Sequence, residues 1–147
     1  MKEKQTKGRK WIWVGVVAVV AAAALLGVLL FGESPFDGIV SDMLKAYPFA
    51  DNARAQDGSY LKIDTNPYDK DVDDMTYVEL SNFEKVQEDS MDAIRFVNGE
   101  LGFTDALYSK MMDTTALMGR QSEENDKYRV SWSYHPDSGL EVMYEKK

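Results

Sequence analysis

The chain of 147 residues contains no cysteine and only one histidine. Without cysteine it forms no disulfide, no thiolate-ligated zinc or iron–sulfur site and no thiol nucleophile. A single histidine also excludes a multi-histidine metal site. Basic residues are also in the minority: the chain has 17 Lys and Arg and 25 Asp and Glu, which gives a formal net charge of −8. An acidic chain without a basic face binds nucleic acid poorly, so we expect no nucleic-acid partner.

Charge is absent from one long apolar run. Residues 11–31 read WIWVGVVAVVAAAALLGVLLF, and a helix of this length crosses a bilayer core about 30 Å thick. Trp11 and Trp13 stand at its start, where indole rings favour the headgroup level. Residues 1–10 carry five bases and one acid, whereas residues 33–147 carry a net charge of −12. This asymmetry predicts a cytoplasmic N-terminus and an outer C-terminal part.

A cleaved signal peptide is the alternative interpretation of the same run. Its apolar region spans about 7–15 residues and ends at an A-x-A-like cleavage site. The run here is longer, and a cut after Gly32 would place Leu30 where a small residue is needed. We therefore expect an uncleaved anchor in a cell membrane, with the following organisation: a basic cytoplasmic tail over residues 1–10, a transmembrane helix over 11–32, a short helix and linker over 33–58, and an extracytoplasmic domain over 59–147.

Periodicity in the outer part predicts an α+β fold. Ser34 and Pro35 match an N-cap and a first helical residue, and Pro48 ends that helix. Residues 50–58 are polar and indicate a linker, and residues 59–65 alternate like a strand. Apolar spacing over 88–114 predicts two helices separated at Gly102, the second capped by Thr104 and burying Met111 and Met112 as core filler.

The C-terminal residues carry the strongest β pattern. Residues 128–135 and 140–145 alternate apolar and polar side chains on either side of the turn HPDSG, as a hairpin requires. Four aromatic residues share its apolar face: Tyr128, Trp132, Tyr134 and Tyr144. We interpret them as sheet core rather than as a sugar- or peptide-binding platform, since the helices need that face. The expected domain packs two or three helices on an antiparallel sheet of three to four strands.

The stretch VSWSYHPDSGLEV, with YLKIDTNPYD and ALYSKMMDT before it, resembles the C-terminal domain of a group of uncharacterised bacterial proteins. Members have a basic N-terminus, one transmembrane helix and this domain. Some carry an N-terminal zinc ribbon, which a chain without cysteine lacks. The resemblance covers residues 59–147 and implies a single-pass protein of the bacterial cell envelope. It implies no activity and no functional residues.

One acidic segment has the composition of a metal site. Asp69, Asp71, Asp73 and Glu79 supply the oxygen ligands that Ca²⁺ prefers, with an alternation like the start of an EF-hand loop. Asp74, however, stands where that loop needs glycine, and Glu79 lies one position early for the bidentate ligand. The alternative interpretation is a solvated acidic loop, extended by its own repulsion, and the two mismatches favour it.

No catalytic constellation is legible in the sequence. His135 precedes Pro136 in a turn and has no nucleophile beside it in sequence, so we interpret it as a turn residue. We expect no enzyme and no cofactor, but a membrane-anchored extracytoplasmic binding or interaction domain whose partner is an envelope protein or a wall polymer. The alternatives are a weak extracytoplasmic Ca²⁺-binding module and, less favoured, a cell-wall-acting hydrolase with paired carboxylates.

Overall fold

The computed structural model describes residues 34–147, and Pro35–Lys147 forms one compact unit. The predicted basic tail and transmembrane helix lie outside the described residues. Within residues 34–147, no helix combines the length and the apolar character that a bilayer crossing needs.

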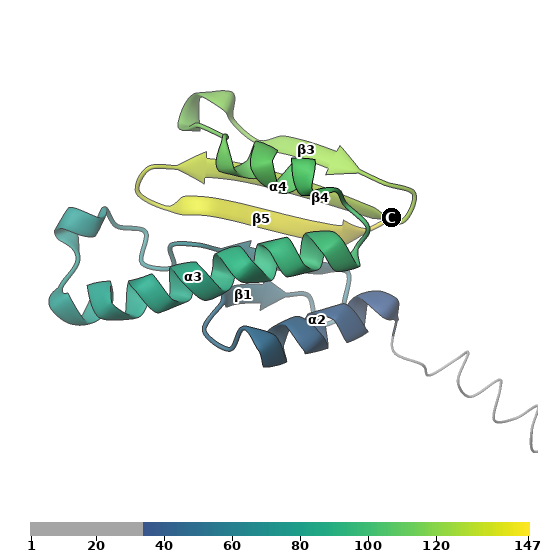
Figure 1. The fold of residues 1–147 in the computed structure, drawn as a ribbon, viewed down its shortest axis with the longest axis horizontal. Coiled ribbons are helices and arrows are strands. Elements are labelled where there is room, and N and C mark those ends of the chain that lie inside the picture. Colours follow the sequence, from purple (N-terminus) through teal and green to yellow (C-terminus); the bar gives the residue numbers. More distant parts are fainter. Residues whose placement is uncertain (1–33) are drawn as a thin grey trace, which may run out of the picture. The chain divides into compact units, whose positions relative to one another are not determined.

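Five antiparallel strands form the sheet of this unit (Figure 1). They are β1 (Asp51–Arg54), β2 (Tyr60–Asp64), β3 (Gln121–Glu124), β4 (Tyr128–His135) and β5 (Gly139–Lys146). Their order across the sheet is β1-β2-β5-β4-β3, so the last strand of the chain lies at the centre. The predicted antiparallel sheet is confirmed, but the expected three to four strands are corrected to five.

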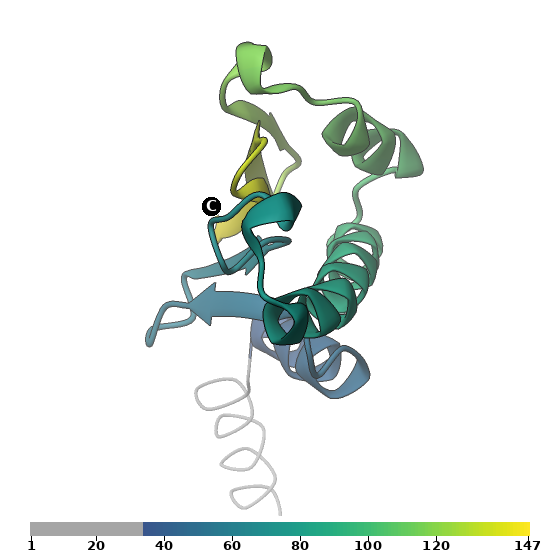
Figure 2. The ribbon, with the colours of Figure 1, turned by 90° about the vertical axis from the view of Figure 1, so that its left-hand side faces the viewer.

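Three α-helices cover one face of the sheet (Figure 2). They are α2 (Pro35–Ala46), α3 (Tyr77–Glu100) and α4 (Asp105–Met112), with 3₁₀ turns η1 (Val72–Asp74) and η2 (Ala116–Met118). The predicted α+β class is therefore confirmed, and so are the start of α2 at Pro35, strand β2 and the β4–β5 hairpin. The helix break also falls where it was predicted, since Gly102 follows α3 with a φ of +80°.

The two edge strands were missed by the sequence interpretation. Residues 50–58 were expected to be a linker, but Asp51–Arg54 pairs along β2 as strand β1. The Asp51 N–H also donates to the Ser90 hydroxyl of α3 over 3.1 Å, which fixes β1 beneath that helix. Strand β3 has the sequence QSEE and pairs with β4. Both strands are short and polar, as exposed sheet edges usually are, so they carry no apolar alternation to detect.

Helix α3 begins eleven residues before the expected start near residue 88, at Tyr77. Its first turn is closed by a capping box, in which the Glu79 N–H donates to the Thr76 hydroxyl and the Thr76 N–H donates to the Glu79 carboxylate. Tyr77 and Val78 are exposed, so the first turns show no buried stripe. The Thr-x-x-Glu spacing, rather than apolar periodicity, marks this start.

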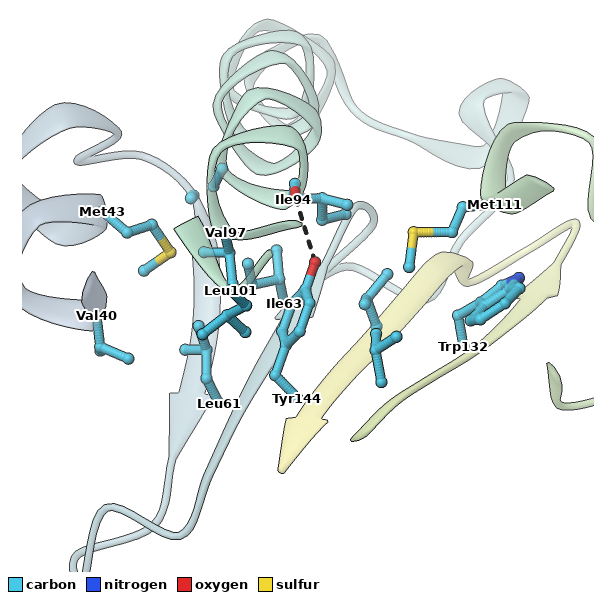
Figure 3. Packing of buried hydrophobic residues seen from close by; sticks show 14 of the residues in the cluster. Val40, Met43, Leu61, Ile63, Ile94, Val97, Leu101, Met111, Trp132 and Tyr144 are labelled. Carbon is cyan, nitrogen blue, oxygen red and sulfur yellow. Dashed lines mark hydrogen bonds between the residues drawn. The ribbon is translucent and has the colours of Figure 1, made fainter. Parts of the chain in front are cut away.

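One core lies between the helices and the sheet (Figure 3). Tyr144 of the central strand is fully buried, and its hydroxyl donates towards Asn98 Oδ1 at 2.9 Å and the Ile94 carbonyl at 3.2 Å, both on α3. Trp132 is also buried, and its indole N–H donates to the Thr114 hydroxyl over 2.8 Å. The core assignment of Tyr144 and Trp132 is confirmed.

The other two aromatic residues of the hairpin, Tyr128 and Tyr134, differ in burial. Tyr128 is half-buried and stacks on Phe36 of α2, with ring centroids 5.8 Å apart. Tyr134 was expected in the core, but 39% of it is exposed. It stands near the end of β4, where the packing around it leaves part of the side chain exposed.

Tyr144→Phe is predicted to lower the free energy of unfolding by about 1–3 kcal/mol, because it leaves the buried Asn98 carbonyl oxygen without its hydroxyl donor. Urea unfolding at neutral pH measures this change. Tyr77→Phe is the matched control, since Tyr77 is 87% exposed and its hydroxyl meets solvent.

The loss of unfolding free energy in Tyr144→Phe is predicted to depend on pH. Burial raises the pKa of Tyr144 well above its usual 10.0, so above pH 10 the unfolded chain loses a proton that the folded chain keeps. This contribution of Tyr144 to stability is complete below pH 10 and declines as the pH rises further. The deficit of Tyr144→Phe should therefore shrink above pH 10. A constant deficit would show that the hydroxyl is not held in the core.

Candidate functional site

An apolar groove opens between α3, α4, the loop before η1 and the β4–β5 turn. The start of α3 and the β4–β5 turn lie at one end of the unit (Figures 1 and 2). Its volume is about 330 Å³. The apolar part of its lining includes Val72, Phe83, Met91, Met111, Met112 and Tyr134. Open apolar hollows of this size are where proteins bind small ligands or single side chains of a partner.

Helix α3 supplies one wall of the groove. Phe83, Gln87 and Met91 follow one another at intervals of four, so they lie on one face of the helix. Ile94 continues this face three residues later and is fully buried in the core. The same stripe that fixes α3 to the sheet therefore runs on into the groove, where the sheet no longer covers it.

The loop after β2 forms a second wall and is held by two buried polar side chains. Asn66 donates from Nδ2 to the Asp137 carbonyl at 2.7 Å and to the Lys70 carbonyl at 2.9 Å. Thr65 Oγ1 accepts from the Leu140 N–H at 2.8 Å. Both bonds to the β4–β5 turn join segments more than seventy residues apart. They fix the loop and the turn as one rigid rim.

The absence of a side chain at Gly139 allows Thr65 and Asn66 to approach the β4–β5 turn closely. Its φ is +71°, which side chains rarely adopt. A Cβ there would also lie 2.6 Å from Thr65 Oγ1 and 3.1 Å from the Asn66 Cβ. The glycine of the HPDSG turn thus lets the loop approach the hairpin backbone closely enough to close this side of the groove.

The four predicted calcium ligands do not form a cluster. In the described part of the chain, no three acidic or histidine side chains lie close enough together to hold a metal ion. Asp69 stands in a turn with a φ of +50°. Asp71 accepts from the Asp73 N–H at 3.0 Å, so it caps η1 rather than pointing to a shared centre.

The Glu79 carboxylate forms hydrogen bonds with residues close to it in sequence. Its carboxylate accepts from Lys70 Nζ at 2.7 Å and from the Thr76 N–H at 2.9 Å. The Lys70 ammonium and the Thr76 donors lower the pKa of Glu79 to about 2. In the structure Glu79 therefore closes the first turn of α3 and ties it to the loop that carries Lys70.

A second hollow, of about 490 Å³, lies between the start of α2 and the β1–β2 turn. Most of its lining is the turn 54–58, and its apolar members Phe36 and Val40 are buried in the core. Its two carboxylates are engaged: Asp37 lies 3.5 Å from Lys146 Nζ, and Asp57 accepts from the Ser59 N–H at 3.0 Å. Hydrogen bonds from the Ser59 side chain and from the Ser59 N–H lower the pKa of Asp57, which makes it a poor general acid.

His135 is exposed, and its Nδ1 accepts from the Asp137 N–H at 3.2 Å. This is the turn role that the sequence predicted. In the described residues the ring contacts no serine or threonine hydroxyl that it could activate.

The sequence interpretation missed most of the groove. Met112 was expected to fill the core, but it is exposed and lines the groove, whereas the burial predicted for Met111 is confirmed. Phe83 and Gln87 were not assigned to any element. The Thr76–Glu79 capping spacing would have extended α3 backwards and placed both residues on the Met91 face.

Comparisons with known proteins do not identify the chain: no family model, no curated protein and no solved structure matches it.

Glu79→Gln is predicted to lower the melting temperature at pH 7, because the amide can still cap α3 but has no charge for Lys70. The depressed pKa means that the carboxylate stabilises the fold fully above pH 4.5 and that this stabilisation is lost as the pH falls through about 2. In thermal melts, the gap between the wild-type chain and Glu79→Gln should narrow steadily as the pH falls below 4.5. Glu84→Gln, on an exposed part of the same helix, controls for loss of a charge alone.

Proposed function

We propose that this chain is a membrane-anchored extracytoplasmic binding domain and that the groove is its binding site. The observation that carries the proposal is the groove itself, an open hollow of about 330 Å³ lined by three methionines and two aromatic residues. Methionine side chains are flexible and polarisable, and binding surfaces that accept apolar groups are often rich in them. The charge pattern and the apolar run of residues 1–31 support the anchor.

Binding is favoured over catalysis by the chemistry of the lining. Asp71 is the one carboxylate that lines the groove, and it already caps η1. Glycoside hydrolysis needs two carboxylates across a cleft, one of them with a raised pKa. The groove offers apolar contact area and a few polar groups at its rim, which suits recognition.

A membrane anchor would favour binding at this site by tethering the domain. Tethering confines the domain to one surface and raises its effective concentration for any partner on that surface. The start of α2, where the described unit begins, and the segments that line the groove, the start of α3 and the β4–β5 turn, lie at opposite ends of this unit (Figure 1). Helix α3 has 24 residues and extends for roughly 36 Å between the two ends. A partner can therefore reach the groove without approaching the start of the domain.

The proposed topology predicts the labelling of single cysteines. The native chain has none, so Ser122→Cys, on exposed edge strand β3, is the only thiol in its variant. A membrane-impermeant maleimide added to intact spheroplasts should label Ser122→Cys at once. Gln5→Cys, before the apolar run, should react only after the membrane is opened. The reverse pattern would overturn the orientation, and labelling of both in intact spheroplasts would argue against an inner tail.

The proposed site predicts position-specific cross-linking in living cells. A photoreactive amino acid placed at Met112, which is exposed in the groove, should give a discrete cross-linked product on irradiation. Tyr134→Ser in the same chain should reduce the yield, because it removes an aromatic ring from the same lining.

Position 122 is the matched control, because Ser122 is also exposed but lies on β3, outside the groove lining. The same photoreactive group there should give no such product. Equal products from both positions, or none from position 112, would contradict the groove as the binding site.

A further inference from the structure

Exposed apolar side chains gather at the groove end of the unit. The described residues include eight large hydrophobic residues with exposed side chains, and seven come from η1, the start of α3, the end of α4, η2 and the end of β4. Figure 2 looks at the end of the unit where these segments lie, and Val72, Met112 and Tyr134 among them line the groove. Leu117 of η2 is 99% exposed, and the eighth, Phe49, lies on the α2–β1 connection. Single exposed apolar residues are ordinary, but a concentration around a hollow marks an interaction site.

Acidic side chains predominate in the segments that border the same groove. Four segments border it, residues 65–74, 83–91, 111–113 and 134–140, and together they contain nine aspartates and glutamates against two lysines and one histidine. Of the two lysines, Lys70 has its ammonium already paired with Glu79 at 2.7 Å. A cation that approaches the rim therefore meets carboxylates, whereas an anion meets repulsion.

We propose that the groove binds a basic peptide segment of a partner protein, with one apolar side chain inserted between α3 and α4 and lysines or arginines on either side. This rests on the proposed function and adds the chemistry of its ligand. The methionine lining accepts an aliphatic or aromatic side chain without a fixed shape. The aspartates on both sides favour flanking cations and disfavour acidic segments, so charge provides the selectivity.

Three synthetic peptides test the proposal on the full chain in phosphatidylcholine nanodiscs, which carry no anionic lipid. GKKGLWGKKG has both the apolar anchor and the cations, GEEGLWGEEG reverses the charge, and GKKGSSGKKG removes the anchor. Calorimetric titration should show binding of the first peptide only. Equal binding of the first and second would overturn the role of charge, and equal binding of the first and third would overturn the apolar anchor.

Variants locate the binding. Met112→Ser should weaken binding of GKKGLWGKKG about tenfold, since it removes apolar area that the bound peptide would cover. Phe49→Ser is the matched control, because Phe49 is 57% exposed but lies outside the groove, and it should leave the affinity unchanged. An equal loss in both variants, or none in either, would overturn the proposed location.

A charge pair of variants tests the rim. Asp137→Asn should weaken binding about two- to fivefold at low salt and less at high salt, because solvent ions screen the exposed carboxylate. Asp126→Asn, in the exposed β3–β4 turn, is the control and should have no effect. An effect of Asp137→Asn that does not change with salt would contradict an electrostatic role.

Two other occupants would produce different results. If the basic residues before the apolar run filled the groove, a full-chain variant with Lys7, Arg9 and Lys10 changed to serine would bind GKKGLWGKKG more tightly than the wild type. If a second copy filled it, Met112→Ser would abolish self-association. Either result would overturn a peptide partner. Failure of all three peptides would overturn the inference alone, since cross-linking from position 112 tests the groove independently.

Discussion

The buried hydroxyl of Tyr144 fixes the longest helix to the middle of the sheet. It is the polar contact by which the central strand holds α3, and the carbonyl of Ile94 and the amide of Asn98 receive it within one turn of that helix. Because an unpaired polar group in this core would be costly, the contact permits only one rotation of α3 about its axis. The stripe formed by Ile94, Met91 and Phe83 then has a fixed direction along the whole helix.

The groove follows from a difference in length. Helix α3 is far longer than β2, so its first turns extend past the sheet, and its apolar stripe has no strand beneath it there. The Asn66 amide and the Thr65 hydroxyl hold the adjoining loop against the hairpin, so the uncovered stripe meets a rigid opposite wall. A capped helix end and a clamped loop together keep the hollow open without a disulfide.

How far the sequence predicts this molecule depends on where burial produces periodicity. The β4–β5 hairpin, β2 and α2 bury one face each and were recognised from alternation or helical spacing. Edge strands β1 and β3 and the first turns of α3 are polar and exposed, so no period marks them.

The groove was harder to predict from the sequence for the same reason. Tyr134 and Met112 follow the core pattern of their elements, and only the ends of those elements, which tertiary packing sets, leave them in the groove. Glu79 has the composition of a metal ligand, but its spacing from Thr76 is that of a helix cap.

The position of β5 affects when the domain can fold. Leu61 pairs with Tyr144, so the two halves of the sheet are joined only by β5, the last of the five described strands to be synthesised. Pairing across such a separation requires closure of a long loop, which is slow compared with forming a local hairpin. A chain that emerges from its N-terminus onwards therefore holds β1 and β2 unpaired with the rest of the sheet until β5 has emerged. During that interval the apolar residues of β2 and α3 are exposed, and the pairing of β5 ends this exposure.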